Sequence, residues 1–215
     1  MRARINQYLT SRFAKPLAFV LGLLPFVWLV VAAVFDWLGA NPAEALERSS
    51  GDWTLRMLCV VLAITPLRTI AGLPPLARFR RMAGLFVYFY AVLHLLAYSW
   101  FDMGFELADI AKDIIKRPFI LVGFTAVVLL TPLALTSFNR AIKALGGRRW
   151  QMLHRLVYAV AVLAVVHFFW MRAGKNDFAE VAVYAVILGS LLAWRVAQSI
   201  KKKGLKPPSE LRSQL

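Results

Sequence analysis

The sequence predicts an all-α membrane protein, a polytopic bundle of six transmembrane helices. Its 215 residues are 60% hydrophobic and only 17% charged, whereas a soluble domain is about half apolar and a quarter charged. The apolar residues gather in six blocks, and the blocks approach the roughly 20 residues of helix that cross a bilayer core. Short segments rich in Pro, Gly or charge separate them.

The expected helices form one membrane domain, residues 1–200. They cover residues 16–38, 54–71, 82–101, 117–136, 150–171 and 178–197. Turn signals between them include Asn41-Pro42, Pro74-Pro75 and Gly146-Gly147. The first apolar run is too long for the core of a signal peptide, so we expect it to stay as a span. Residues 201–215 form a basic tail that we expect to be flexible and cytoplasmic.

Two connecting segments are expected to have roles of their own. In residues 102–116 the apolar side chains recur at helical spacing, which predicts a short amphipathic helix at the membrane interface. The segment from Asn41 to Trp53 is expected to be a loop. It is either an interfacial loop with an aromatic anchor or a docking surface for a partner.

The charge distribution predicts the orientation. The formal net charge is +15. Of the 26 Lys and Arg residues, 18 lie in the N-terminal arm, the second and fourth connections and the tail, while acidic residues gather in the other connections. Lys and Arg favour the cytoplasmic side, so both termini should be cytoplasmic. The basic residues sit in short loops between apolar blocks and form no nucleic-acid motif, so we expect a lipid membrane and no nucleic acid as the partner.

All three histidines fall inside expected spans. His94 is in the third span, and His154 and His167 are in the fifth. The two spans run in the same direction, and the flanking charges place His94 and His167 in the outer half with depths that differ by roughly 5 Å. Imidazole is a good iron ligand, so we expect His94 and His167 to hold a haem between two helices.

His154 has a different expected place. It is 13 residues before His167, which is roughly 20 Å of helix, so one iron cannot bind both. His154 could hold a second haem near the cytoplasm, although no further histidine completes that site. Alternatives remain open for all three histidines: hydrogen-bonded packing in the core, or a proton or transport pathway.

Six arginines at the cytoplasmic side form a further candidate set, with Arg68, Arg81 and Arg155 as the residues of interest. The set is Arg68, Arg80, Arg81, Arg148, Arg149 and Arg155. One interpretation is a topology signal with lipid headgroup contacts. The other is pairing with haem propionates, with a flavin phosphate or with an acidic electron donor. Arg155 directly follows His154 and lies slightly inside its span, where an unpaired charge is expensive.

Several motifs resemble the ferric reductase-like transmembrane family. They are Arg80-Arg81-Met82-Ala83-Gly84-Leu85, Tyr90-Ala91-Val92-Leu93-His94 and the stretch from Trp150 to Tyr158 with His167 after it. Further segments are similar to its branch of haem-binding membrane subunits of periplasmic methionine-sulfoxide reductase systems. These are Asn41-Pro42 with Glu44, Arg48, Gly51 and Trp53; Thr65-Pro66-Leu67-Arg68; Lys116-Arg117-Pro118-Phe119-Ile120 with Gly123; and Pro132-Leu133-Ala134 with Thr136-Ser137.

The resemblance implies a function. It implies b-type haem, one or two per chain, and electron transfer across the bacterial inner membrane to a periplasmic molybdoprotein methionine-sulfoxide reductase that repairs oxidised proteins. FMN is associated with this family, but the sequence has no phosphate-cradling glycine loop. Electrons would come from a cytosolic flavin reductase or from quinol. Span three has one histidine where the oxidases of the family have two. The competing function within the same fold is a ferric or quinone-linked reductase.

Overall fold

Six helices of the computed structural model, which describes residues 2–174 and 176–204, are long and apolar enough to cross a membrane. They lie within Ala14–Val34, Pro42–Ala71, Pro74–Phe101, Pro118–Leu135, Gly147–Ala173 and Ala179–Lys201. No strand occurs among the described residues. The prediction of an all-α bundle of six spans is confirmed.

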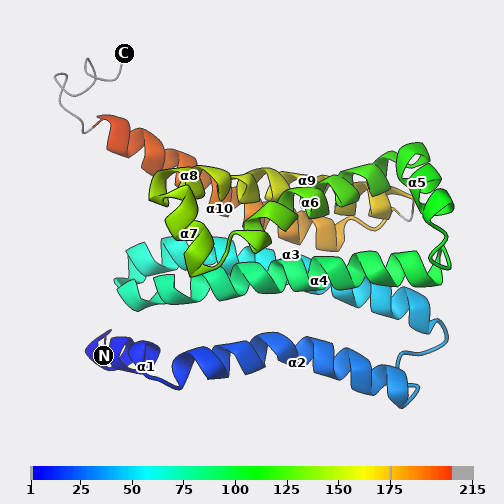
Figure 1. The fold of residues 1–215 in the computed structure, drawn as a ribbon, viewed down its shortest axis with the longest axis horizontal. Helices are drawn as coiled ribbons and strands as arrows, with labels where there is room; N and C mark the ends of the chain where they lie inside the picture. Colours follow the sequence, from blue (N-terminus) through cyan, green and yellow to red (C-terminus); the bar gives the residue numbers. More distant parts are fainter. Residues whose placement is uncertain (1, 175, 205–215) are drawn as a thin grey trace.

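The helices carry the following labels in Figure 1. The elements are α1 (Arg2–Thr10), α2 (Ala14–Val34), α3 (Pro42–Ala71), η1 (Pro74–Phe79), α4 (Arg80–Phe101), α5 (Leu107–Lys116), α6 (Pro118–Leu135), α7 (Asn139–Leu145), α8 (Gly147–Leu153), α9 (Leu156–Ala173) and α10 (Ala179–Gly204). The amphipathic helix expected within 102–116 is α5. α10 continues to Gly204, and the rest of the predicted tail, 205–215, lies outside the described residues.

The prediction of a loop from Asn41 to Trp53 is wrong. α3 begins at Pro42, twelve residues before the expected start. Asn41 is its N-cap, and the Asn41 side chain accepts a hydrogen bond from the Glu44 backbone N–H. Asn before Pro is a turn signal, but it is equally a helix start, because Asn caps the first turn and Pro fits its first position. The presumed docking loop is therefore a rigid first part of α3.

The fifth span is interrupted where a continuous helix was expected. α8 ends at Leu153 and α9 begins at Leu156, so His154 and Arg155 lie in the turn between two helices. No Pro or Gly marks this break in the sequence. The interruption gives His154 and Arg155 positions that helical periodicity alone does not predict.

Four helices build the centre of the bundle. α3 packs against α4, and α6 packs against α9, while α10 covers α3 and α9. Figure 1 shows α2 along one side of this core. The most deeply buried side chains come from α3, α4, α9 and α10, and they include Leu58, Leu62, Val87, Val160 and Leu188. The packing leaves the faces turned towards lipid apolar, as membrane helices require.

One side chain of the core, Tyr90, makes the polar contact with α2. The Tyr90 hydroxyl of α4 donates to the Gly22 carbonyl at 2.8 Å, and it accepts from the Phe26 N–H at 3.2 Å. Helix α2 contains Pro25, and a Cβ at Gly22 would collide with the Phe86 ring. Gly22 therefore allows α2 and α4 to approach closely enough for the Tyr90 contact.

The two ends of the bundle differ in charge. In the view of Figure 1, the N-terminus, α7, α8 and the end of α10 lie on the left, and α5 lies on the right. Every Asp and Glu of the described residues belongs to the end with α5, namely Asp36, Glu44, Glu47, Asp52, Asp102, Glu106, Asp109, Asp113, Asp177 and Glu180. We call the end with α5 the acidic end and the opposite one the basic end.

Candidate functional site

Two cavities lie one above the other inside the helix bundle. The first, of about 360 Å³, is nearer the acidic end, and we call it the outer cavity. The second, of about 510 Å³, is nearer the basic end, and we call it the inner cavity. Leu130 lines both, and on α3, α4 and α9 the nearest lining residues of the two cavities are about one turn apart, as Ala91 and Val87 are. The cavities are therefore separated by a single layer of side chains.

His94 enters the outer cavity from α4. Its Nδ1 is 2.9 Å from the backbone carbonyl oxygen of Glu47 on α3. A Cβ added at Gly51, one turn after Glu47, would lie 3.3 Å from the imidazole ring. The carbonyl fixes the orientation of the ring, and the glycine lets the ring lie close to the α3 backbone. Nδ1 is thereby occupied as a donor, and Nε2 remains for a ligand.

His167 enters the same cavity from α9 and repeats this arrangement. Its Nδ1 is 2.6 Å from the carbonyl oxygen of Phe119, in the first turn of α6. A Cβ at Gly123 would be only 2.8 Å from the ring, closer than real Cβ contacts. Each imidazole is therefore held by a backbone carbonyl and set against a glycine one turn further along the neighbouring helix.

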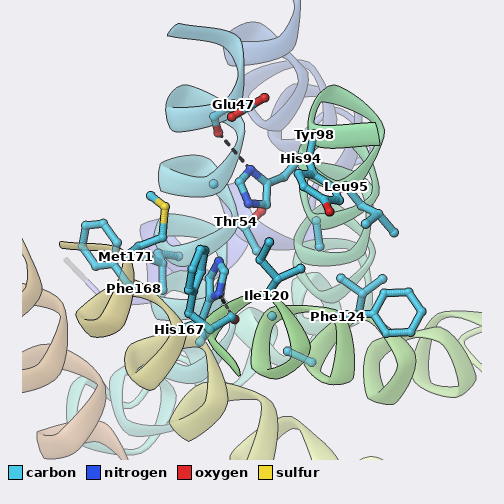
Figure 2. A pocket seen from close by; sticks show the side chains of 18 of the residues that line it. Glu47, Thr54, His94, Leu95, Tyr98, Ile120, Phe124, His167, Phe168 and Met171 are labelled. Carbon is cyan, nitrogen blue, oxygen red and sulfur yellow. Dashed lines mark hydrogen bonds between the residues drawn. The ribbon is translucent and has the colours of Figure 1, made fainter. Parts of the chain in front are cut away.

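The two imidazoles face each other across the cavity, as Figure 2 shows. Their ring centroids are 6.2 Å apart, and their planes are inclined at 73°. A metal ion bonded to one nitrogen of each of two imidazoles at about 2 Å places the centroids roughly 6 Å apart. The structure thus brings together the pair that the sequence selected, and the spacing suits a single metal ion between the rings.

The rest of the outer cavity is mostly apolar and is closed by charged residues at its mouth. Three arginines line the mouth, and each is paired with a carboxylate. Arg48 is 3.8 Å from Glu44, Arg117 is 2.8 Å from Asp113, and Arg172 contacts both Asp177 at 3.2 Å and Glu180 at 2.6 Å. Arg172 is itself buried. Positive charge at this end is locally neutralised.

His154 lies apart from the other two histidines, in the lining of the inner cavity. Its Nε2 is 3.1 Å from the Thr136 hydroxyl, and its ring stacks on Trp150 with centroids 4.0 Å apart. The Trp150 indole N–H donates to the Thr136 carbonyl at 2.9 Å. His154 is thus attached to the end of α6 by side-chain contacts, and Nε2 would have to leave Thr136 to bind a metal.

The predicted arginines Arg68, Arg80, Arg81 and Arg155 also line the inner cavity, and the structure adds Arg195 to them. The described part of this lining contains no carboxylate. The partners found for these side chains are neutral: Arg80 donates to Thr65, Arg81 donates to Asn139, and Arg195 donates to Tyr158 and to the Leu62 carbonyl. The inner cavity therefore concentrates positive charge that no protein carboxylate balances.

Sequence reasoning missed several residues of these sites. Arg195 was counted only as a topology charge, although it reaches the inner cavity from α10. Gly51 and Gly123 contributed only to the family resemblance, and their contact with the imidazoles depends on helix packing. The carbonyls of Glu47 and Phe119 carry no sequence signal, since every residue has one.

Comparison with known proteins gives the family. The sequence model described as "Ferric reductase like transmembrane component" matches residues 50–165. The protein-methionine-sulfoxide reductase heme-binding subunit MsrQ of Polaromonas naphthalenivorans (strain CJ2) is 69% identical over 191 residues, which are 89% of this chain and 87% of that protein. The chain belongs to the MsrQ branch of the ferric reductase-like transmembrane family.

Other relatives extend this family comparison. The MsrQ of Herminiimonas arsenicoxydans is 50% identical over 189 residues, which are 88% of this chain and 87% of that protein. The magnetosome protein MamZ of Magnetospirillum gryphiswaldense is 44% identical over 190 residues, which are 86% of this chain but 29% of that protein. No solved structure matches the chain. The family match includes His94 and His154, and His167 follows it by two residues.

Proposed function

We propose that this chain is the haem-bearing membrane subunit of a methionine-sulfoxide reductase system and that it carries electrons across the bacterial inner membrane. The recipient would be a periplasmic molybdoprotein that reduces methionine sulfoxide in oxidised proteins. The observation that carries the proposal is the facing pair of His94 and His167 in the outer cavity. Relatives that match nearly the whole chain are named as heme-binding subunits of such a reductase, which supports the same assignment.

The residues of the outer cavity fit a b-type haem. His94 and His167 would bind its iron through Nε2, because Nδ1 of each is engaged by a backbone carbonyl. The haem would supply a centre that takes up and releases one electron at a time. Leu58, Phe124 and the other apolar residues of the lining would exclude water from it and thereby influence its potential.

The orientation is part of the proposal. With both termini cytoplasmic, the basic end would face the cytoplasm, and the distribution of Lys and Arg supports this orientation. The inner cavity then lies on the donor side, and the outer cavity lies on the side of the periplasmic partner. The single layer of residues around Leu130 between the cavities supports a short route for electrons.

The inner cavity would receive an anionic group on the electron path. Arg68, Arg81 and Arg155 would pair with the propionates of a second haem, with the phosphate of FMN or with acidic residues of the donor. His154 would be a ligand of such a second haem only after it released Thr136. The donor would be a cytosolic flavin reductase or quinol, and both deliver electrons at the basic end.

A vesicle assay tests the electron-transfer function. The purified protein is inserted into liposomes that contain trapped ferricyanide, and reduced FMN, an anion that crosses lipid slowly, is added outside. We expect the wild-type protein to bleach the trapped ferricyanide. The His167→Ala variant should bleach it no faster than protein-free liposomes do. The proposal is wrong if wild-type and protein-free liposomes lose ferricyanide equally fast. Trapping ferric citrate in place of ferricyanide, with the reduced FMN still outside, tests the alternative of a ferric reductase.

A further inference from the structure

Asp113 is the only buried carboxylate among the residues that the structure describes. It belongs to α5, the short amphipathic helix at the acidic end, and is 9% exposed. Each of its oxygens contacts a different element. Oδ2 accepts a hydrogen bond from the Tyr98 hydroxyl of α4 at 2.7 Å, and Oδ1 forms an ion pair with Arg117, 2.8 Å from its Nε. A buried carboxylate is expensive unless it is paired in this way.

These partners connect Asp113 to the two imidazoles of the outer cavity. Tyr98 lies one helical turn after His94, on the same face of α4, and both line the cavity. Arg117 is two residues before Phe119, whose carbonyl accepts from His167 Nδ1. The carboxylate therefore joins the segment that carries His94 to the segment that orients His167.

The start of α6 is also joined to Asp113 through its backbone. Arg117 is the N-cap residue of α6, and no side chain makes a capping hydrogen bond there. Arg117 is also the C-cap residue of α5. The Arg117 backbone N–H donates to the Asp113 carbonyl at 3.0 Å. Asp113 thus contacts Arg117, two residues before Phe119, through both its backbone and its side chain.

We propose that Asp113 is a positioning residue: by linking Tyr98 to Arg117 it fixes the Phe119 carbonyl relative to His94 and thereby sets the 73° angle between the two imidazole planes. This inference rests on the proposed function, in which the two rings bind one haem iron. The mutual angle of two axial imidazoles determines the magnetic anisotropy of low-spin ferric haem. A fixed, nearly perpendicular pair gives one strongly anisotropic signal, and a variable angle gives a broad or divided one.

Electron paramagnetic resonance of the purified, haem-loaded protein tests this. We expect one strongly anisotropic ferric signal from the wild type. In Tyr98→Phe, which removes only the hydroxyl, and in Asp113→Asn, the signal should broaden or divide into two species while haem remains bound. Asp113→Asn should also raise the midpoint potential, because it removes a negative charge beside Arg117. Asp109→Asn, an exposed residue of the same helix, is the matched control and should leave both readings at their wild-type values.

The possible outcomes separate the two proposals. If Tyr98→Phe and Asp113→Asn bind haem with the wild-type signal, Asp113 does not position the ligands and this inference is wrong. Should Asp113→Asn fail to accumulate, Tyr98→Phe decides the question alone. Wild-type protein that binds no haem when haem is plentiful would overturn the proposed function, and the inference would fall with it.

Discussion

The outer and inner cavities share α3, α4, α6 and α9, and α8 and α10 also line the inner one, but their polar residues differ in kind. The outer cavity holds two imidazoles, each oriented by a backbone carbonyl, and its arginines are paired with carboxylates. The inner cavity holds one imidazole, oriented by a threonine hydroxyl and a tryptophan ring, and five arginines without a carboxylate in its described lining. The outer cavity is thus organised around two imidazoles that we propose as metal ligands, and the inner one around positive charge.

The difference shows how a few contacts decide the use of a buried histidine. A carbonyl that takes Nδ1 leaves Nε2 for a metal, whereas the Thr136 hydroxyl occupies Nε2 of His154 itself. The break between α8 and α9 places His154 beside Thr136. We therefore expect changes in the two cavities to have separable effects, and the following variants test this.

The largest effect is expected at Gly123. In Gly123→Ala the new methyl group would lie 2.8 Å from the His167 ring and displace it, so we expect haem affinity to fall by about tenfold or more, the usual cost of disturbing a metal ligand's surroundings. Gly51→Ala, with its 3.3 Å contact to His94, should have a smaller effect. The control is Gly84→Ala, where the nearest atom is 4.0 Å away. Titration of the apoprotein with haem measures all three, and equal affinities would contradict this account of the outer cavity.

An intermediate effect is expected from the arginines of the inner cavity. Replacing Arg68, Arg81 and Arg155 together by Gln should slow reduction of the haem by reduced FMN about tenfold at low salt, since clustered charge accelerates encounters with anions. The dependence on salt should weaken at the same time. Arg48→Gln, at the acidic end and paired with Glu44, is the control. Stopped-flow reduction rates that respond equally to both changes would show that the inner arginines do not guide the donor.

The smallest effect is expected at Thr136. Thr136→Val keeps the shape of the side chain but removes its hydrogen bond to His154, which should cost about 0.5–1.5 kcal/mol of stability. The haem of the outer cavity should stay bound. Thr125→Val, whose exposed hydroxyl bonds only to the Leu121 carbonyl in its own helix, should lose less stability. Thermal unfolding in detergent compares the two, and loss of haem from Thr136→Val would mean that the cavities are not independent.

Much of this arrangement could be predicted from the sequence because the membrane constrains it. Apolar blocks of spanning length gave the six helices, and three histidines inside those blocks gave the candidate ligands. The sequence predicts that His94 and His167 differ in depth by roughly 5 Å, and their ring centroids lie 6.2 Å apart in one cavity. That estimate used Arg172 as the outer end of the fifth span, but Arg172 is buried in the bundle beside Asp177 and Glu180.

Other features depend on packing and left no pattern in the sequence. The link from Tyr98 through Asp113 to Arg117 joins residues of three elements, and an acidic residue in an amphipathic helix is ordinarily exposed to water. Arg195 reaches the inner cavity because α10 packs against α3 and α9. No Pro or Gly in the sequence indicates the break at His154 and Arg155.

The haem content of histidine variants tests the central claim, that the outer pair and not His154 holds the haem. The measurement is the haem-to-protein ratio, by pyridine haemochrome, of wild type, His94→Ala, His167→Ala and His154→Ala, each purified in detergent from cells supplied with haem. We expect His94→Ala and His167→Ala to lose the low-spin b-type spectrum. His154→Ala should keep it, and a partial loss of haem there would identify a second site in the inner cavity. Full haem content in His94→Ala and His167→Ala, with loss only in His154→Ala, would contradict the account.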